Sequence, residues 1–208
     1  MFSWISHIFH NIYVSPMDRI HWAMFLLPAG WLILSNLTWI SAGARKAFCF
    51  LCLLATVASS LVILYMTVLG RGGGTREIYL IPFYSFREAR QRPEFYRQLT
   101  MNVFLFEPPG LAAPFATEYI LAYIHPKRSR NRKTASAAVC AGCGLLFCAA
   151  LSVLIEVCQC VFALGRAETD DLIMNLLGAS VGTGIYALHI ACGKLREGAL
   201  NNRSPRTD

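Results

Sequence analysis

Long apolar runs separated by short polar segments make up most of this chain. A helix needs about 20 consecutive apolar residues to cross the hydrocarbon core of a bilayer. We predict that the apolar runs cross a membrane at residues 21–40, 47–69, 99–124, 135–164 and 171–193. The pattern therefore predicts an all-α fold, a polytopic membrane helix bundle of about five transmembrane helices.

The third run, residues 99–124, is the least regular of these predicted spans. Asn102, Glu107 and Glu118 are polar, and Pro108-Pro109-Gly110 is expected to break the helical hydrogen bonding. A broken or re-entrant helix is tolerated at membrane depth only where protein or water covers it. Two interpretations of Glu107 stay open: it reaches the interface or pairs with a loop arginine, or it belongs to a site.

The segments outside the predicted spans suggest three regions. Residues 1–69 hold two spans after an amphipathic helix over residues 1–18, which is predicted to lie on the membrane surface. Residues 70–193 form the second region. Its first part, the loop of residues 70–98, carries an apolar patch with Pro82 and Phe83, too short to span and expected to fold back onto the bundle or the membrane. Residues 194–208 are predicted to form a loose polar tail.

Composition and charge agree with a membrane protein. The chain has 208 residues, 55% hydrophobic and 15% charged, with a mean hydropathy of +0.46. A soluble domain would carry roughly a quarter charged residues, so there is no room for a sizeable soluble domain. The net charge of +7 comes from basic loops rather than from a basic face, which argues against nucleic acid as a partner.

The distribution of Lys and Arg predicts the orientation in the plasma membrane. Five spans place eleven basic residues on the side of Arg45-Lys46, residues 127–133 and the tail, against eight on the other side. Basic residues in short loops favour the cytoplasm. We therefore predict a cytoplasmic carboxyl terminus.

The eight cysteines all lie in apolar runs. Cys49/Cys52 and Cys140/Cys143 have the C-x-x-C spacing of some metal or redox pairs. No His lies close to either pair, and free Cys behaves as a small apolar residue. We predict no metal site and no cofactor.

Polar residues gather around the turn between the last two spans. Ionisable groups near lipid are expensive, and they are usually kept only where they pair, face protein or line a water-filled cavity. The predicted topology brings the 70–98 loop and the start of the third span to the same end. The candidate site consists of Glu156, Gln159, Arg166, Asp170, Asp171, Asn175, Asn102 and Arg97, with Pro82 and Phe83 as a loop motif.

Helical spacing aligns part of this cluster into one stripe. Asp171, Asn175, Gly178 and Gly182 follow the i, i+4, i+7, i+11 pattern of a single helix face. Gly178 and Gly182 form a small-x-x-x-small motif, which lets another helix approach closely. Blander interpretations stay open, since this motif is common packing and Asp171 could simply cap the last helix.

The polar residues of this turn also carry a family resemblance. An acidic residue and Gln on one helix, then Gly-Arg, then Asp, Asn and Gly opening the next, resemble the VanZ-like family of bacterial membrane proteins. The resemblance runs over residues 70–193. The matching positions are Glu156, Gln159, Gly165-Arg166, Asp171, Asn175 and Gly178, together with Leu80-Ile81-Pro82-Phe83 and with Asn102, Phe106, Pro108 and Gly110.

Three positions depart from the family pattern. Tyr79 stands where Asn is usual before the Pro-Phe segment, and Glu107 and Pro109 stand where apolar residues are usual. The family is named after a protein that raises resistance to the glycopeptide teicoplanin. The resemblance therefore implies a cell-envelope protein.

Binding of a polar head group is the leading functional hypothesis. The ligand would be a lipid-linked cell-wall precursor or a glycopeptide at the outer leaflet, with membrane lipids as further partners. Arg166 and Arg97 would meet phosphate or carboxylate, because Arg forks suit both. Glu156 and Asp171 would hold these arginines in place.

Three other interpretations are open. Paired carboxylates could serve an enzyme acting on a lipid head group, although no His, nucleophile elbow or zinc signature lies near them. A small transporter or a subunit of one would use a broken span and buried acids. The cluster could also be purely structural and only hold the last two helices together.

Overall fold

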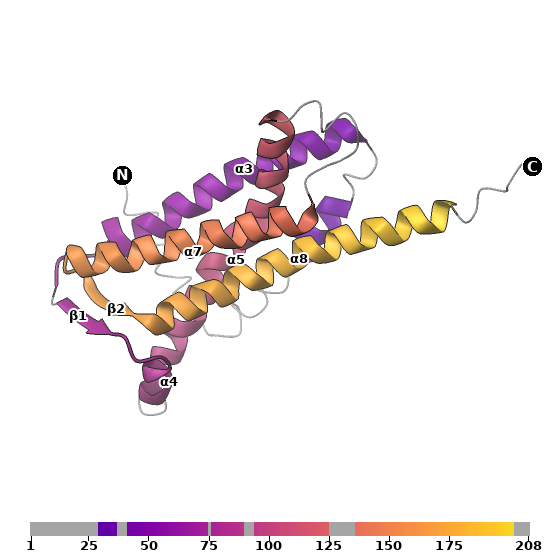
Figure 1. Ribbon diagram of the computed structural model, residues 1–208. Coiled ribbons are helices and arrows are strands. Elements are labelled where there is room, and N and C mark those ends of the chain that lie inside the picture. The colour runs from indigo at the N-terminus through magenta and orange to yellow at the C-terminus, as the bar shows by residue number, and fades with distance from the viewer. Residues whose placement is uncertain (1–28, 37–40, 75, 90–93, 125–135, 202–208) are drawn as a thin grey trace, which may run out of the picture.

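The computed structural model describes residues 29–36, 41–74, 76–89, 94–124 and 136–201 (Figure 1). The amphipathic helix predicted for residues 1–18 and the basic loop of residues 127–133 lie outside these ranges. Of the first predicted span, only residues 29–36 are described, and they are helical. Residue 29 is therefore the first residue of the described fold.

Four long helices form the bundle. They are α3 (Ala42–Leu64), α5 (Glu94–Ile124), α7 (Ala137–Val161) and α8 (Thr169–Asn201). A π-helical turn, η2 (Tyr65–Leu69), extends α3, and a short helix, α4 (Tyr84–Ala89), precedes α5. Helix α5 packs against α3, α7 and α8 and so occupies the centre of the bundle.

Two short strands modify the all-α prediction. Strand β1 (Arg76–Tyr79) pairs in parallel with β2 (Gly165–Glu168), with Arg76 opposite Gly165 and Tyr79 opposite Glu168. The 70–98 loop was predicted to fold back onto the bundle. Its strand β1 does so by pairing with β2, in the turn between α7 and α8 (Figure 1). The pairing thus joins the segment before α5 to the segment after α7 at one end of the bundle.

The helices alternate in direction between two ends of the bundle. Helix α3 runs towards β1, α5 runs away from it, α7 runs towards β2, and α8 runs away again (Figure 1). The strands and α4 lie at one end, which we call the strand end. The start of α3 and the end of α8 lie at the opposite end, as the predicted topology required.

Among the residues that the structure describes, three helical stretches are long and apolar enough to cross a membrane: Gly43–Leu69, Ala137–Val161 and Thr169–Arg196. They agree with three of the five predicted spans, and the count of about five is not confirmed. Large apolar side chains on these helices point away from the bundle, among them Leu54, Leu61, Leu146 and Val157. Apolar side chains on the outer face suit a membrane, because they can contact the apolar lipid tails there.

The boundaries of two helices differ from expectation. Arg45 and Lys46 were predicted in a turn but lie in the first turns of α3, where the Ser41 hydroxyl accepts the Ala44 amide at 3.1 Å and caps the helix. The tail predicted as loose from Lys194 is helical to Asn201. Its Lys, Leu, Arg and Ala residues are good helix formers, so α8 continues beyond its apolar part.

The predicted break at Pro108-Pro109-Gly110 is wrong. Helix α5 is continuous through Pro108, Pro109 and Pro114. Pro114 lacks the N–H that would bond to the Gly110 carbonyl one turn earlier, and the Thr183 hydroxyl of α8 donates to that carbonyl at 3.0 Å instead. A membrane helix tolerates proline when a neighbouring helix satisfies the freed carbonyl, which is the case here.

Replacing Thr183 by Val should destabilise the bundle by about 1–3 kcal/mol, because the buried Gly110 carbonyl would lose its partner. The measurement is detergent-induced unfolding followed by circular dichroism. In a Pro114→Ala background, the restored amide can bond to Gly110, so Thr183→Val should then have a smaller effect. Equal effects in both backgrounds would contradict this account.

The buried side chains form two apolar clusters along α5. Phe115 makes edge-to-face contacts with Phe48 at 5.1 Å and with Tyr186 at 4.9 Å between ring centroids. Cys52 and Cys140 are buried in the same cluster. These cysteines are free and pack as small apolar residues.

Candidate functional site

The candidate site lies at the strand end of the bundle. Strands β1 and β2, helix α4, the end of α7 and the first turns of α8 meet there (Figure 1). The chain reverses direction twice at this end, so its polar turn residues come together.

Asp170 holds the segment that links β1 to α4. Its two carboxylate oxygens accept the backbone amides of Phe83 at 2.5 Å and of Ser85 at 2.7 Å. Phe83 has a positive φ of 63°, an uncommon conformation for a residue with a side chain. Asp170 itself is buried, so it acts as a fixed acceptor that keeps this tight turn in place.

Glu168 is the buried centre of the site. One carboxylate oxygen accepts a short hydrogen bond from the Ser85 hydroxyl. The other forms an ion pair with Arg166 at 2.8 Å. The Glu168 side chain is only 2% exposed, whereas Arg166 is 28% exposed. Arg166 therefore compensates a buried charge while one face of its guanidinium reaches the surface.

Tyr79 packs against Arg166. The guanidinium carbon lies 4.6 Å from the centroid of the Tyr79 ring, and Tyr79 stacks on Tyr84 at 4.9 Å. Glu77 approaches Arg166 at 3.6 Å, and its charge and its hydrogen bond with the Tyr79 phenol raise the pKa of that phenol above its ordinary value. Glu77 and Tyr79 thus hold Arg166 beside strand β1.

The end of α7 is tied to β2 and η2. Glu156 accepts the backbone amide of Glu168 at 2.9 Å, which attaches the far edge of β2 to the helix. The Gln159 amide donates to the Thr67 carbonyl at 3.2 Å. Arg76 donates to the Val161 carbonyl at 3.0 Å.

The start of α8 is joined to α5 and α7. The Asn102 amide donates to the Asp171 carboxylate at 2.7 Å, and Gln98 also bonds to this carboxylate. The Asn175 amide donates to the Ser152 hydroxyl at 2.9 Å. Arg71 lies close enough for its positive charge to act on Asp171 and on Glu156.

Small residues bring α8 and α5 into backbone contact just below this network. A Cβ added at Gly178 would lie 2.1 Å from the Val103 carbonyl oxygen, and one added at Gly182 would lie 2.4 Å from the Glu107 carbonyl oxygen. The stripe of Asp171, Gly178 and Gly182 thus faces α5.

The outer surface of the strand end is apolar and basic. Leu80 and Ile81 are 73% and 61% exposed, and Phe83 beside them is also mostly exposed. Arg71 and Arg76 are exposed on the same loop. Exposed apolar side chains and arginines on one loop suit an amphiphile with an anionic group, because Arg binds phosphate and carboxylate through paired donors.

The structure brings together most of the residues predicted for the site. The described Arg97 backbone belongs to α5, and its side chain lies outside the described part. Sequence reasoning missed Glu168, Ser85 and Ser152. Glu168 stands in the acidic turn between Arg166 and Asp170, and this position was the available signal for it.

Glu107 and Glu118 lie apart from this network. Glu107 is buried, so it does not reach the interface, and its Oε1 atom has no hydrogen-bond partner within the described ranges. Glu118 pairs with Arg45 at 2.9 Å and accepts the Tyr186 hydroxyl at 2.7 Å. It therefore belongs to the opposite end of the bundle.

These features define a helical membrane protein in which a polar network closes one end of the bundle around two short strands. A family model described as VanZ/LLP1 matches residues 47–190, and the chain accordingly belongs to the VanZ-like family. The match includes α3, which precedes the 70–193 region of resemblance. No curated protein and no solved structure matches the chain.

Proposed function

We propose that this VanZ-type membrane protein binds the polar head group of a lipid-linked cell-wall precursor, or of a glycopeptide, and thereby lowers glycopeptide susceptibility. The observation that carries the proposal is that the strand-end loop exposes both an apolar turn, at Leu80 and Ile81 after strand β1, and two arginines, Arg71 before that strand and Arg76 at its start. Such ligands are amphiphiles with anionic groups. The turn would contact their apolar part and the arginines their phosphate or carboxylate.

The buried carboxylates support this surface as a scaffold. Asp170 fixes the backbone at Phe83 and Ser85, and Glu168 fixes both Ser85 and Arg166. A turn held in one conformation loses little entropy on binding, which favours affinity. The polar network thus has a structural role that prepares the outer surface for its ligand.

Arg166 would contribute through its exposed face beside Tyr79, rather than as a free cation. Its Nε lies against Glu168, so Arg166→Ala would leave a buried carboxylate unpaired and destabilise the protein. Arg71 is exposed on the loop and forms no ion pair within the described residues, although its charge acts on Asp171 and Glu156, so replacing it disturbs the scaffold less than replacing Arg166 would. The test of binding should therefore not depend on Arg166.

The strand end would face the outer leaflet of the plasma membrane. The opposite end carries Arg45, Lys46, Lys194 and Arg196, and five further basic residues stand in the sequence between α5 and α7, at residues 127–133. An excess of Lys and Arg in short loops marks the cytoplasmic side. This orientation exposes the proposed surface to cell-wall precursors and to glycopeptides.

The test compares Arg71→Gln/Ile81→Ser with a matched control, Arg196→Gln/Leu195→Ser, which removes one exposed arginine and one exposed apolar residue from the other end. Vesicles containing a polyprenyl diphosphate, or its neutral polyprenol, are the binding probes. We expect the wild type to prefer the diphosphate. The strand-end variant should bind it about tenfold more weakly, since one lost contact of this kind is typically worth such a factor, and the control should bind normally.

The same three proteins, at matched membrane levels, should be compared for teicoplanin susceptibility in a Gram-positive host. Wild type and control should protect, and the strand-end variant should not. The proposal would be wrong if the wild-type protein showed no preference for the diphosphate and gave no protection. The fold and the family assignment would not be affected by that result.

A further inference from the structure

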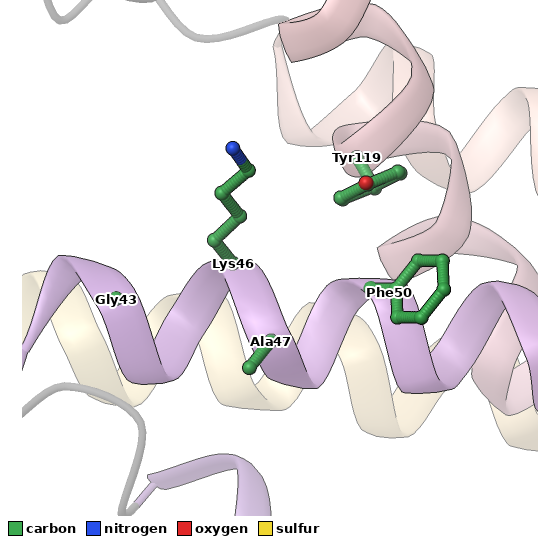
Figure 2. Close-up of a pocket in the computed structure, with 5 residues that line it drawn as sticks. All are labelled: Gly43, Lys46, Ala47, Phe50 and Tyr119. Atoms are coloured by element: carbon green, nitrogen blue, oxygen red, sulfur yellow. The ribbon is translucent and has the colours of Figure 1, made fainter.

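A hollow of about 290 Å³ lies between α3 and α5 at the end of the bundle opposite the strands (Figure 2). Gly43, Lys46, Ala47 and Phe50 line it from α3, and Tyr119 lines it from α5. This volume is at the small end of ligand sites, which run from roughly 300 to 1,000 Å³. The hollow therefore suits a head group and its first linkage rather than a whole amphiphile.

Two aromatic residues, Phe50 and Tyr119, and two small residues, Gly43 and Ala47, line the hollow. The rings of Phe50 and Tyr119 lie 5.5 Å apart at 51° and come from the two facing helices. A Cβ added at Gly43 would meet no atom within 4 Å, so the absence of a side chain there leaves the space open. Figure 2 shows the Lys46 side chain extending from α3 on the same side as the Tyr119 ring.

Lys46 supplies positive charge at the hollow. It is exposed, and no carboxylate in the described part of the chain forms an ion pair with it. The neighbouring acid on α5, Glu118, is engaged by Arg45 at 2.9 Å and by the Tyr186 hydroxyl at 2.7 Å. The negative charge of Glu118 is thus compensated, and the hollow keeps a net attraction for anions.

The depth of these residues matches the layers of a membrane surface. The apolar stretch of α3 begins at Gly43, so Lys46 lies at the polar boundary. Phe50 is one turn further in, about 6 Å along the axis. Tyrosine is enriched at this level of membrane proteins, because one end of its ring is apolar and the other is polar.

We propose that this hollow binds the head group of an anionic phospholipid from the leaflet at this end of the bundle. Lys46 would meet the phosphate, the Tyr119 hydroxyl would lie at the same polar level, and Phe50 would contact the glycerol and the first acyl carbons. Gly43 would determine access, because any larger side chain there fills the space. The site is separate from the head-group surface proposed at the strand end.

The experiment measures how added lipid stabilises the purified full-length chain in detergent against heat. A ligand that binds only the folded state raises the melting temperature. Phosphatidylglycerol is the probe, and phosphatidylcholine is the zwitterionic reference. We expect phosphatidylglycerol to stabilise the wild type more than phosphatidylcholine, with the dependence on lipid concentration giving an apparent affinity.

Two variants remove the site in different ways, and each has a matched control. Lys46→Gln should weaken the phosphatidylglycerol effect about fivefold, the factor expected for one cation at a membrane surface. Gly43→Leu should abolish it by filling the hollow. The controls are Lys194→Gln, an exposed lysine on α8, and Gly142→Leu, at a helical position where an added Cβ also meets nothing within 4 Å.

Both controls should keep the lipid preference of the wild type. The proposal is overturned if the wild type shows no preference for phosphatidylglycerol, if Gly43→Leu retains it, or if Lys194→Gln loses it as fully as Lys46→Gln does. The lipid-free melting temperature of each variant reports its folding. Lys46→Gln changes only an exposed side chain, so it tests the site without disturbing the core.

Discussion

Gly178→Ala should destabilise the protein by more than about 3 kcal/mol, the upper part of the range for overpacking a close contact. The new Cβ would lie 2.1 Å from the carbonyl oxygen of Val103 and 2.8 Å from its carbonyl carbon. Both are backbone atoms of α5, so no side chain can move aside. The two helices would have to separate, which would also strain the bond between Asn102 and Asp171.

The measurement is unfolding in mixed detergent micelles, followed by helical circular dichroism. Gly184→Ala is the matched control, because it lies on the same helix and its added Cβ meets nothing within 4 Å. That control should be neutral or stabilising by up to about 1 kcal/mol, since Ala is a better helix former than Gly. Equal stabilities for the two variants would disprove the close backbone contact.

Asp170→Ala should release the segment between β1 and α4. Its carboxylate accepts two backbone amides, at 2.5 Å from Phe83 and 2.7 Å from Ser85. Hydrogen bonds to a charged group contribute about 1.5–3 kcal/mol each, so the segment should lose on the order of 3–6 kcal/mol of local stability. The effect should be local, because the helices pack through other residues.

Hydrogen exchange of the Phe83 and Ser85 amides measures this loss directly, since exchange reports the free energy of local opening. The matched control is Glu77→Ala, which removes a carboxylate from the same end. Glu77 is 44% exposed and only 3.6 Å from Arg166, and exposed ion pairs contribute little. Slow exchange in Asp170→Ala, or equally fast exchange in Glu77→Ala, would show that Asp170 does not hold the turn.

The apolar runs and the polar stripe could be predicted from the sequence because both are periodic. Helices α7 and α8 follow the predicted runs, since uninterrupted apolar residues of sufficient length allow little else near lipid. The spacing of Asp171, Asn175, Gly178 and Gly182 indicated one helix face. Asp171, Gly178 and Gly182 contact α5, whereas Asn175 bonds to Ser152 of α7. Local patterns of this kind depend only on neighbours in the same helix.

The features that could not be predicted depend on residues far apart in the chain. Helix α5 continues through Pro108, Pro109 and Pro114, and the Gly110 carbonyl that Pro114 leaves free is satisfied by Thr183, on another helix. Strand β1 exists because β2 supplies its partner, and four residues carry too short a pattern to indicate pairing by themselves. The role of Glu168 depends on its contacts with Ser85 and Arg166, and the contact with Ser85 joins residues far apart in the chain.

The parallel pairing of β1 with β2 has a consequence for the order in which the chain matures. A ribosome delivers the chain from its amino terminus, so β1 is made before α5 and α7, and β2 only after both. Until then β1 is an unpaired edge, open to incorrect partners. A chain interrupted before Gly165 therefore already contains α3, α5 and α7 but cannot complete its strand end, which assembles only after α7 has been made.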